Sequence, residues 1–450
     1  WFRLLFWGML VCFPVWGQYV QPIDMVILLD RSGSMINTDP DGITAPAAAF
    51  IVEQLMLANP ENRVAVVPFA SQAYILGRKG TLNPGSALTS SFPAVVGMLQ
   101  AGNSQGAFTF RELAPDDPQK FLDLLRTQMR EEGETELELA LQLAGGIFSG
   151  SDDNRRKIIV LISDGEPYPV IRRELERRFG HNLVQQAARE RAAGREKGPN
   201  NRRLVRMYQE YILNKVAPAI RSAGIELYPI AFVGEGQAQA PLIEYLKTLK
   251  QRITGDDNVI IANRQNLIAQ LIDFVPSNFN HIRVAKIEPF MPEGQASKDW
   301  DITIPNIGKQ IRFFLFYPEA RPNQRVGVKI YRDGQLVGED INPERFTPLV
   351  YHQFLDRGGR LVFQSFQLIG RDNAAGQFRL VLSPAGTRTM PAANLLVDLN
   401  TSIYPEIAFT PTPPIAQEDC DGLLQLRDLE TDRTFSIEHL NLVSQGIYPE

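Results

Sequence analysis

Five oxygen-bearing side chains in this 450-residue sequence have the types and spacing of a metal site. They are Asp30, Ser32, Ser34, Thr135 and Asp164. Hydroxyls and carboxylates suit a hard cation such as Mg²⁺ or Mn²⁺, and the set has no thiolate or imidazole to select zinc. The two carboxylates only neutralise a dication, because the hydroxyls add no charge. A metal held in this way keeps its attraction for an outside oxygen, which an acidic side chain of a partner protein could supply.

Two apolar stretches are expected to bring the carboxylates together. Met25–Leu29 runs directly into Asp30, and Ile158–Ile162 is followed by Ser163 and then Asp164. Continuous apolar runs of this length are typical of strands that are buried on both faces. Ligands of an open parallel sheet bind outside the carboxyl ends of its strands. We therefore expect both carboxylates at one edge of a sheet, with Thr135 just ahead of a helix.

The chain from Ile23 to about Asn280 alternates between strand-like and helix-like patterns. Further apolar runs lie at Val64–Phe69, Ile225–Phe232 and Val259–Ile261. Apolar residues at helical spacing lie between them, in three groups: Ala47, Phe50, Ile51 and Leu55; Leu137, Ala140, Leu141 and Ala144; Leu267, Leu271 and Phe274. This alternation predicts an α/β fold with a doubly wound, mostly parallel sheet and helices on both sides.

Two long segments, 76–120 and 166–221, do not fit a minimal fold of this class and are interpreted as insertions. The first is rich in Gly, Pro, Ser and Thr and has no assignable structure. The second carries an excess of basic residues: Arg172, Arg173, Arg177, Arg178, Arg189, Arg191, Arg195, Lys197, Arg202, Arg203, Arg206, Lys215 and Arg221 against Glu166, Glu174, Glu176, Glu190, Glu196 and Glu210. One interpretation is a solvated helix with ion pairs along it. The other is a docking surface for an acidic partner or for anionic lipid headgroups.

The pattern changes to short strands after Pro276. Asp333-Gly334 lies between apolar stretches and predicts a hairpin. Strands are expected at Asp301–Ile304, Ile311–Tyr317, Arg325–Tyr331, Arg360–Leu368 and Gln377–Leu382. We interpret residues 281–403 as an all-β sandwich of the immunoglobulin kind. Residues 404–450 are interpreted as a proline-rich linker, Pro405–Pro414, followed by the start of a further β module at Gly422–Leu426 and Thr434–Ile437.

Residues 1–17 have the features of a secretory signal peptide or of an N-terminal anchor. Arg3 precedes an apolar run, Leu4–Val11, that is shorter than the roughly 20 residues of a membrane span. The predicted location is therefore secreted or in the cell envelope, with membrane anchorage an open alternative. The net charge of −5 provides no basic field for nucleic acid. The two cysteines, Cys12 and Cys420, form no disulfide framework if the N-terminal segment is removed.

The motif D-x-S-x-S at Asp30, with a later Thr and a later Asp-Gly after an apolar strand, resembles the metal-ion-dependent adhesion site of von Willebrand factor A domains. All five positions match, and Asn37–Gly42 resembles the segment that follows the motif in bacterial members. The resemblance covers about Ile23–Asn280, with enlarged loops at 76–120 and 166–221, and we place the domain of this kind at residues 18–280. It implies that Ser32 and Ser34 bind the metal directly. It also implies that the threonine and the aspartates bind directly or through water.

These features favour a protein-binding function over an enzymatic one. The resemblance implies an adhesion-type module of an extracytoplasmic protein, in which Mg²⁺ bridges to an acidic residue of a protein partner. An alternative is a scaffold for assembly in the cell envelope, and a less favoured one is a metal-dependent hydrolase. The histidines are scattered, at His181, His281, His352 and His439. The sequence also has no nucleophile elbow, phosphate-binding loop or H-E-x-x-H motif.

Overall fold

The computed structural model describes much of the chain between residues 21 and 435. The described ranges are 21–58, 62–73, 133–149, 151, 154–234, 240–279, 282–294, 297–304, 308–318, 320–321, 324, 326–346, 349–356, 359–370, 374–385, 390–401, 403–410, 421–428 and 433–435. The signal-like segment 1–17, the insertion 76–120 and both cysteines lie outside these residues.

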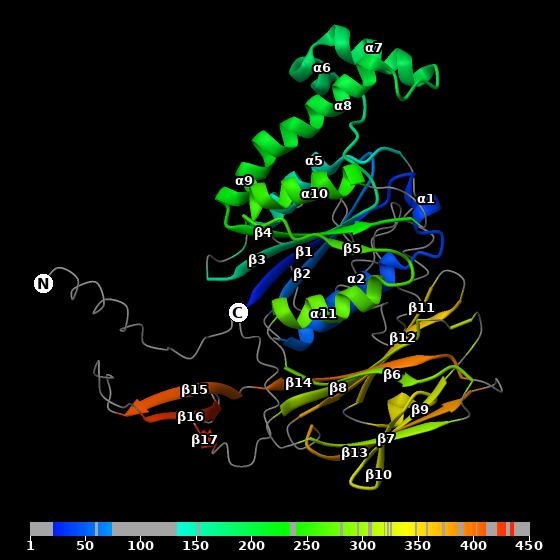
Figure 1. Cartoon of the computed structure of the whole chain (residues 1–450), viewed down its shortest axis with the longest axis vertical. Coiled ribbons are helices and arrows are strands. Elements are labelled where there is room, and N and C mark those ends of the chain that lie inside the picture. The colour runs from blue at the N-terminus through cyan, green and yellow to red at the C-terminus, as the bar shows by residue number, and fades with distance from the viewer. Residues whose placement is uncertain are drawn as a thin grey trace, which may run out of the picture.

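A sheet of five parallel strands forms the first part of the molecule, in the order β2-β1-β3-β4-β5 (Figure 1). The strands are β1 (Ile23–Asp30), β2 (Arg63–Phe69), β3 (Arg156–Ser163), β4 (Ile225–Phe232) and β5 (Ile260–Ala262). The chain moves from β1 to β2 on one side and later to β3 on the other. Strand order therefore reverses between β1 and β3, and ligands of open α/β sheets bind at such a switch point.

Helices cover both faces of this sheet, as the sequence predicts. Met25 and Ile27 pack in one buried cluster, with α2 (Thr44–Ala58) and α11 (Leu267–Phe279). Val26 and Leu28 pack in a second cluster, with α5 (Leu137–Phe148), α9 (Ala217–Ser222) and α10 (Ala240–Ile253). Alternate residues of a strand point to opposite faces, so a strand with two covered faces has to be apolar throughout. The predicted α/β class is confirmed.

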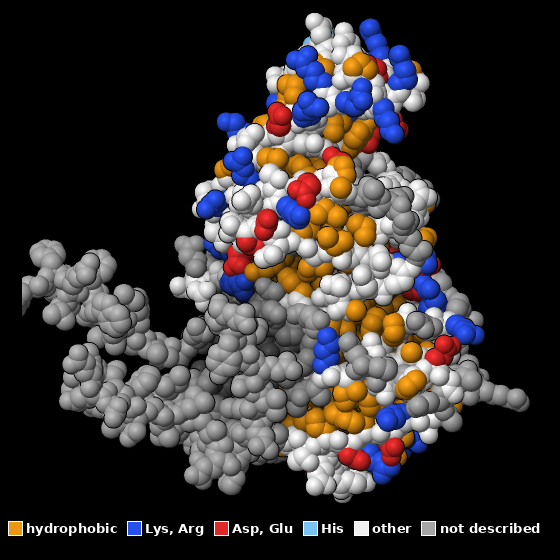
Figure 2. All heavy atoms as spheres, viewed as in Figure 1, with side chains coloured by type: hydrophobic (Ala, Val, Ile, Leu, Met, Phe, Trp, Pro, Cys, Tyr) orange, Lys and Arg blue, Asp and Glu red, His pale blue; other side chains and the backbone are white. Residues whose placement is uncertain are grey.

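Helices of the basic insertion project beyond the rest of the α/β part (Figure 1). They are α6 (Arg173–Phe179), α7 (His181–Ala192) and α8 (Pro199–Tyr211), and a π-helical turn (η2, Ile212–Val216) leads from α8 into α9. They are not a single solvated helix, because their buried side chains contribute to the second cluster: Leu175, Val184, Ala187, Leu204 and Tyr208. Lys and Arg side chains gather on the visible surface of these helices (Figure 2).

Two antiparallel sheets follow and share a buried core. One has the order β11-β12-β8-β14-β6 and the other β10-β9-β13-β7. Their strands are β6 (Ile282–Met291), β7 (Lys298–Ile304), β8 (Gly308–Phe316), β9 (Val326–Arg332), β10 (Gln335–Glu339), β11 (Leu349–Leu355), β12 (Leu361–Ile369), β13 (Gly376–Pro384) and β14 (Ala393–Thr401). The rings of Phe313 and Phe378 meet between the sheets, with centroids 5.4 Å apart. The predicted β architecture is confirmed, whereas its likeness to immunoglobulin domains stays a prediction.

The predicted hairpin at Asp333-Gly334 joins β9 to β10. Asp333 and Gly334 have φ angles of 50° and 81°, which are the positive values that a two-residue type I′ turn requires. Arg332 and Gln335 pair directly across this turn. The sequence did not indicate β6, β11 or β14.

The proline-rich segment that was expected as a linker is partly a strand. Its first half lies in β15 (Ile403–Thr410), which pairs antiparallel with β16 (Asp421–Asp428). A further short strand, β17 (Arg433–Phe435), completes the order β15-β16-β17. Pro405 lies in β15, which is at the edge of the three described strands, and edge strands are where sheets accept proline. The expectation of a plain linker was wrong for these residues.

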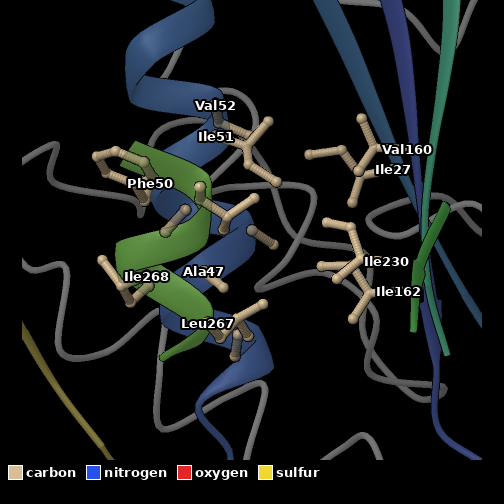
Figure 3. Packing of buried hydrophobic residues seen from close by; sticks show 14 of the residues in the cluster. Ile27, Ala47, Phe50, Ile51, Val52, Val160, Ile162, Ile230, Leu267 and Ile268 are labelled. Atoms are coloured by element: carbon tan, nitrogen blue, oxygen red, sulfur yellow. The ribbon is translucent and has the colours of Figure 1, made fainter. Parts of the chain in front are cut away.

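The α2–α11 layer lies between the parallel sheet and the first antiparallel sheet. Figure 3 shows Ile51 and Val52 on the side of α2 that faces Ile27 and Val160 of the sheet, with Phe50 on the other side. The ring of Phe50 lies 4.8 Å from that of Phe314 on β8, centroid to centroid. One apolar cluster therefore extends from the α/β part into the β part. No helix among the described residues is long and apolar enough to cross a membrane.

Candidate metal site

Asp30 lies at the carboxyl end of β1 with both carboxylate oxygens held. The backbone N–H of Ser32 donates to its Oδ1 at 2.8 Å, which is the local turn that an aspartate forms with the residue two positions on. The hydroxyl of Ser163, at the end of the neighbouring strand β3, donates to its Oδ2 at 2.5 Å. The adjacent strands β1 and β3 therefore fix the orientation of this carboxylate.

The other four predicted ligands lie beside Asp30. Ser32 Oγ and Ser34 Oγ are 3.0 Å apart, and Ser34 Oγ donates to Asp164 Oδ1 at 2.7 Å. A Cβ atom placed on Gly165 would lie 3.2 Å from Thr135 Oγ1 and 3.6 Å from Ser34 Oγ. Segments more than 100 residues apart in the sequence thus converge at one edge of the sheet, as predicted. Metal ligation by these five residues stays a prediction.

The donor set fits a divalent cation. Asp30 is 1% exposed and Asp164 5% exposed, so two carboxylates of like charge are held together out of water. Burial, and then the neighbouring charge of Asp164, raise the pKa of Asp30 to about 7. A dication between the carboxylates would remove this repulsion and favour both ionised forms. Ser34 is exposed, so an ion at this site would remain accessible to an outside ligand.

Three loops are tied together around the predicted threonine ligand. Gly33 N–H donates to the carbonyl of Gly133 at 3.0 Å. This bond joins the loop that carries Ser32 and Ser34, the serine loop, to the segment that precedes Thr135. Glu134 N–H donates to Ser71 Oγ at 3.0 Å, which joins the same segment to the loop after β2. Gly133 has a φ of +92°, and a Cβ atom there would lie 1.9 Å from Ser71 Oγ. Glycine is therefore required at this close approach.

A buried carboxylate beside Thr135 holds the basic insertion against the loops that carry the predicted ligands. Glu136 is fully buried, and its Oε2 accepts a hydrogen bond of 2.7 Å from the hydroxyl of Tyr208 on α8. Its Oε1 accepts a hydrogen bond from the backbone N–H of Val170. Burial raises the pKa of Glu136, while the hydrogen bond from Tyr208 opposes that rise. Tyr168 N–H also donates to the carbonyl of Thr135, at 3.0 Å.

Three arginines of the insertion pair with three glutamates that surround the threonine. The pairs are Arg191–Glu134 at 3.4 Å, Arg172–Glu136 at 3.5 Å and Arg178–Glu138 at 2.7 Å. The guanidinium of Arg178 also lies 3.8 Å from the ring centre of Tyr211. Sequence reasoning missed this network. The available signal was the spacing of the glutamates on either side of Thr135 in a chain whose basic excess lies in the insertion.

The segment after the serine loop is fixed by a second buried aspartate. Asp39 accepts hydrogen bonds from Ile43 N–H at 2.7 Å and from Thr44 Oγ1 at 2.6 Å, at the start of α2. Burial raises the pKa of Asp39 to about 6. The short helix α1 (Met35–Thr38) thus connects the predicted ligands to a capped helix.

The described histidines lie on elements away from the predicted ligands, whereas Glu166 lies in the loop that carries Asp164. His181 is on α7, with its Nδ1 3.0 Å from Glu176, and His352 is on β11 of the β part. His281 and His439 lie outside the described residues. Glu166 is an exposed loop residue, and its Oε2 accepts a hydrogen bond of 2.9 Å from Gln209 of α8.

Comparison with known proteins finds similarity only at the level of solved structures. No family model and no curated protein matches the sequence. A von Willebrand factor type A protein from Catenulispora acidiphila is 11% identical, with 85% of this chain and 63% of that chain covered and a TM-score of 0.31. The von Willebrand factor domain of the type V pili tip protein Mfa5 from Porphyromonas gingivalis is 14% identical, with 57% and 95% covered and a TM-score of 0.34.

A third similar structure is proximal thread matrix protein 1 from the mussel byssus, with a zinc-occupied MIDAS motif. It is 13% identical, with 64% of this chain and 50% of that chain covered and a TM-score of 0.32. The chain therefore spans less than two thirds of the first and the third of these proteins. These scores are too low to assign the chain to a family.

Proposed function

We propose that this chain is a metal-ion-dependent protein-binding module, with a site of the kind that its sequence resembles in von Willebrand factor A domains. Asp30, Ser32, Ser34, Thr135 and Asp164 would hold Mg²⁺ or Mn²⁺. An acidic side chain of a partner protein would supply a further ligand. The bound ion would act as a Lewis acid, which accepts an electron pair from an oxygen of that carboxylate. We further propose that the module acts outside the cytoplasm, as the signal-like segment 1–17 predicts.

The observation that carries this proposal is the convergence of five uncharged or singly charged oxygen donors at the switch point of the sheet. Two carboxylates balance the charge of a dication without exceeding it, so the ion would retain its affinity for a third carboxylate. Three hydroxyls complete a set that suits a hard cation. The linked positions of Ser32, Ser34 and Asp164 support their action as one site.

The surface beside the predicted ligands is also suited to a macromolecular partner. Ile36 follows directly after the serine loop, on α1, and is 53% exposed. Removal of an exposed apolar side chain from water by a partner is favourable. A partner that placed a carboxylate on the ion would cover this side chain. Substitution of Ile36 by Ser should therefore weaken partner binding and leave metal affinity unchanged.

We propose that the site binds and does not catalyse. The hydroxyl of Ser34 is directed to Asp164 at 2.7 Å, and the two described histidines lie on α7 and β11, away from the serine loop. Among the residues that the structure describes, neither serine is therefore paired with an imidazole base of the kind that activates a nucleophile.

The decisive experiment is metal titration of the whole chain by calorimetry, with Mg²⁺ and with Mn²⁺. The wild-type chain should bind one ion. The double variant Ser32→Ala/Ser34→Ala should bind it at least about tenfold more weakly, because each serine supplies a ligand. Ser222→Ala is the matched control, since its exposed hydroxyl donates to the carbonyl of Ala219 within α9, on a different element from the predicted ligands. Absence of binding by the wild type, or equal binding by the double variant, would refute the proposal.

A further inference from the structure

The outer face of α8 carries a row of arginines that begins beside the predicted metal loops. Arg202, Arg206 and Gln209 have the spacing i, i+4 and i+7, which places them on one face of the helix. Both arginines are exposed, whereas Leu204 and Tyr208 on the other side of α8 are buried. We call this face of α8, from Gln209 to Arg202, the arginine row, and its charges are those of Arg202 and Arg206.

The inner end of this row is fixed to the loop that carries Asp164. Gln209 Nε2 donates to Glu166 Oε2 at 2.9 Å and to the carbonyl of Pro167 at 3.4 Å. Glu166 lies only two residues after the predicted ligand. From Gln209 the row extends outward along α8 for roughly 10 Å, at about 1.5 Å per residue. The arginine row therefore starts at the loop that carries Asp164 and leads away from that loop.

The arginines of the row differ from those that hold the insertion in place. Arg172, Arg178 and Arg191 pair with glutamates around Thr135 and are structural. Among the residues that the structure describes, Arg202 and Arg206 form no ion pair. Figure 2 shows basic side chains gathered over α6 to α8, with few acidic ones between them. Such unpaired charge attracts an anionic partner and guides its approach.

We propose that the arginine row and the metal site bind one acidic peptide segment of a partner protein. One carboxylate of the segment would ligate the ion, and further carboxylates along the segment would pair with Arg206 and Arg202. This inference rests on the proposed function, because it assigns the chemistry of the partner at the same site. It identifies the partner as a segment with several acidic residues.

A peptide fits this surface better than an anionic membrane does. Glu166 lies between the predicted ligands and the row, and Glu210 lies next to Gln209, and both are exposed. A continuous anionic surface would be repelled by these two carboxylates. A peptide can space its acidic side chains around them. Four of the five predicted ligands are also nearly buried, so a single side chain can reach the site more easily than a flat surface can.

The test measures the binding of a fluorescent oligoglutamate peptide to the whole chain by anisotropy, with Mg²⁺ and with a chelator. In Mg²⁺, Arg202→Glu/Arg206→Glu should bind the peptide at least about tenfold more weakly than the wild type, because two attractive pairs become repulsive. The matched control is Lys215→Glu/Arg221→Glu. It makes the same change in net charge at two other exposed basic residues and should bind within about threefold of the wild type.

Calorimetric titration with Mg²⁺ separates this inference from the proposed function. Both charge-reversed variants should bind the ion as the wild type does. Suppose that the wild type binds Mg²⁺ but Arg202→Glu/Arg206→Glu binds the peptide as well as Lys215→Glu/Arg221→Glu does. The arginine row is then not a peptide site, although the proposed function stands. Failure of the wild type to bind Mg²⁺ would refute the proposed function itself. Binding to phosphatidylserine vesicles that requires the row and resists the chelator would overturn the inference in favour of a membrane.

Discussion

Arg360 Nη2 donates a hydrogen bond of 2.6 Å to Asp41 Oδ2, across 319 residues of sequence. Asp41 belongs to the segment that follows the predicted metal ligands, and Arg360 precedes β12 of the β part. Arg264, just ahead of α11, reaches the same carboxylate oxygen at 3.0 Å. Arg360 is itself held by Asp356, through the pair between its Nε and Asp356 Oδ2 at 2.5 Å. A single carboxylate thus joins the α/β part to the β part at a polar edge of their apolar contact.

Substitution of Asp41 by Asn should lower the free energy of unfolding by about 1 kcal/mol, because two partly exposed ion pairs are lost while the shape is retained. The measurement is denaturant unfolding of the whole chain. Glu293→Gln is the control, because its pair with Arg321 at 3.0 Å is more exposed. That variant should change stability by less than about 0.5 kcal/mol. Equal effects of the two substitutions would show that Asp41 does not join the two parts.

Gly133→Ala should destabilise the chain and weaken Mg²⁺ binding together, because the new methyl group would displace Ser71 and the Thr135 loop. Gly180 provides a close control, since its φ of +94° matches the +92° of Gly133 but a Cβ atom there meets nothing within 4 Å. Both substitutions carry the cost of a positive φ, roughly 1–3 kcal/mol. Only Gly133→Ala should change metal affinity. The argument fails if Gly180→Ala weakens Mg²⁺ binding as much.

The sequence was sufficient to predict the parallel sheet and the convergence of the predicted ligands. A strand buried on both faces has to be apolar throughout, so β1 and β3 stand out, and their carboxyl ends have to share an edge. Asp30 is the last residue of β1, and Asp164 follows β3 directly. Thr135 could be placed by its position ahead of an amphipathic helix.

The contacts around these residues could not be predicted, because they join distant segments through side chains. Nothing local marks Tyr208 as the partner of Glu136, since a tyrosine on the buried face of α8 satisfies the helical pattern whether or not its hydroxyl is used. The same holds for Asp41 and Arg360. Strands β6, β11 and β14 were missed because their polar and apolar residues alternate irregularly around bulges, which β14 shows twice against β6.

Without metal, the chain should lose stability as the pH rises. The pKa of Asp30 is raised to about 7 from its ordinary 3.8, so the folded state binds this proton more tightly than the unfolded state does. The contribution is complete below the ordinary pKa and is lost as the pH rises through about 7. Asp39, with its pKa raised to about 6, acts in the same direction over a lower range. Thermal unfolding in a chelator at several pH values measures the effect.

The variant Asp30→Asn separates the contributions of Asp30 and Asp39 to the pH dependence of stability. The amide is neutral at every pH, so the loss of stability above pH 6 should disappear while the part due to Asp39 remains. At pH 8 in a chelator, the free energy of unfolding of this variant should exceed that of the wild type by about 1 kcal/mol or more. Each unit by which folding raises the pKa of Asp30 costs the ionised wild type roughly 1.4 kcal/mol. For the wild type, Mg²⁺ affinity should rise across the same range, because the ion competes with the proton. A lower stability of Asp30→Asn in the chelator would show that burial and the charge of Asp164 do not destabilise the ionised form of Asp30.

Tyr208→Phe should weaken Mg²⁺ binding although Tyr208 is none of the predicted ligands. The substitution removes the hydrogen bond of 2.7 Å to Glu136 and leaves a buried carboxylate with one partner fewer, at a cost of about 1–3 kcal/mol in stability. Because Glu136 follows Thr135 directly, its displacement should move the threonine hydroxyl. Tyr211→Phe is the control, since Phe retains the ring face that contacts Arg178 at 3.8 Å. Calorimetry should show several-fold weaker binding for Tyr208→Phe and wild-type binding for Tyr211→Phe. Unchanged binding by a destabilised Tyr208→Phe would show that the insertion supports the fold without positioning Thr135.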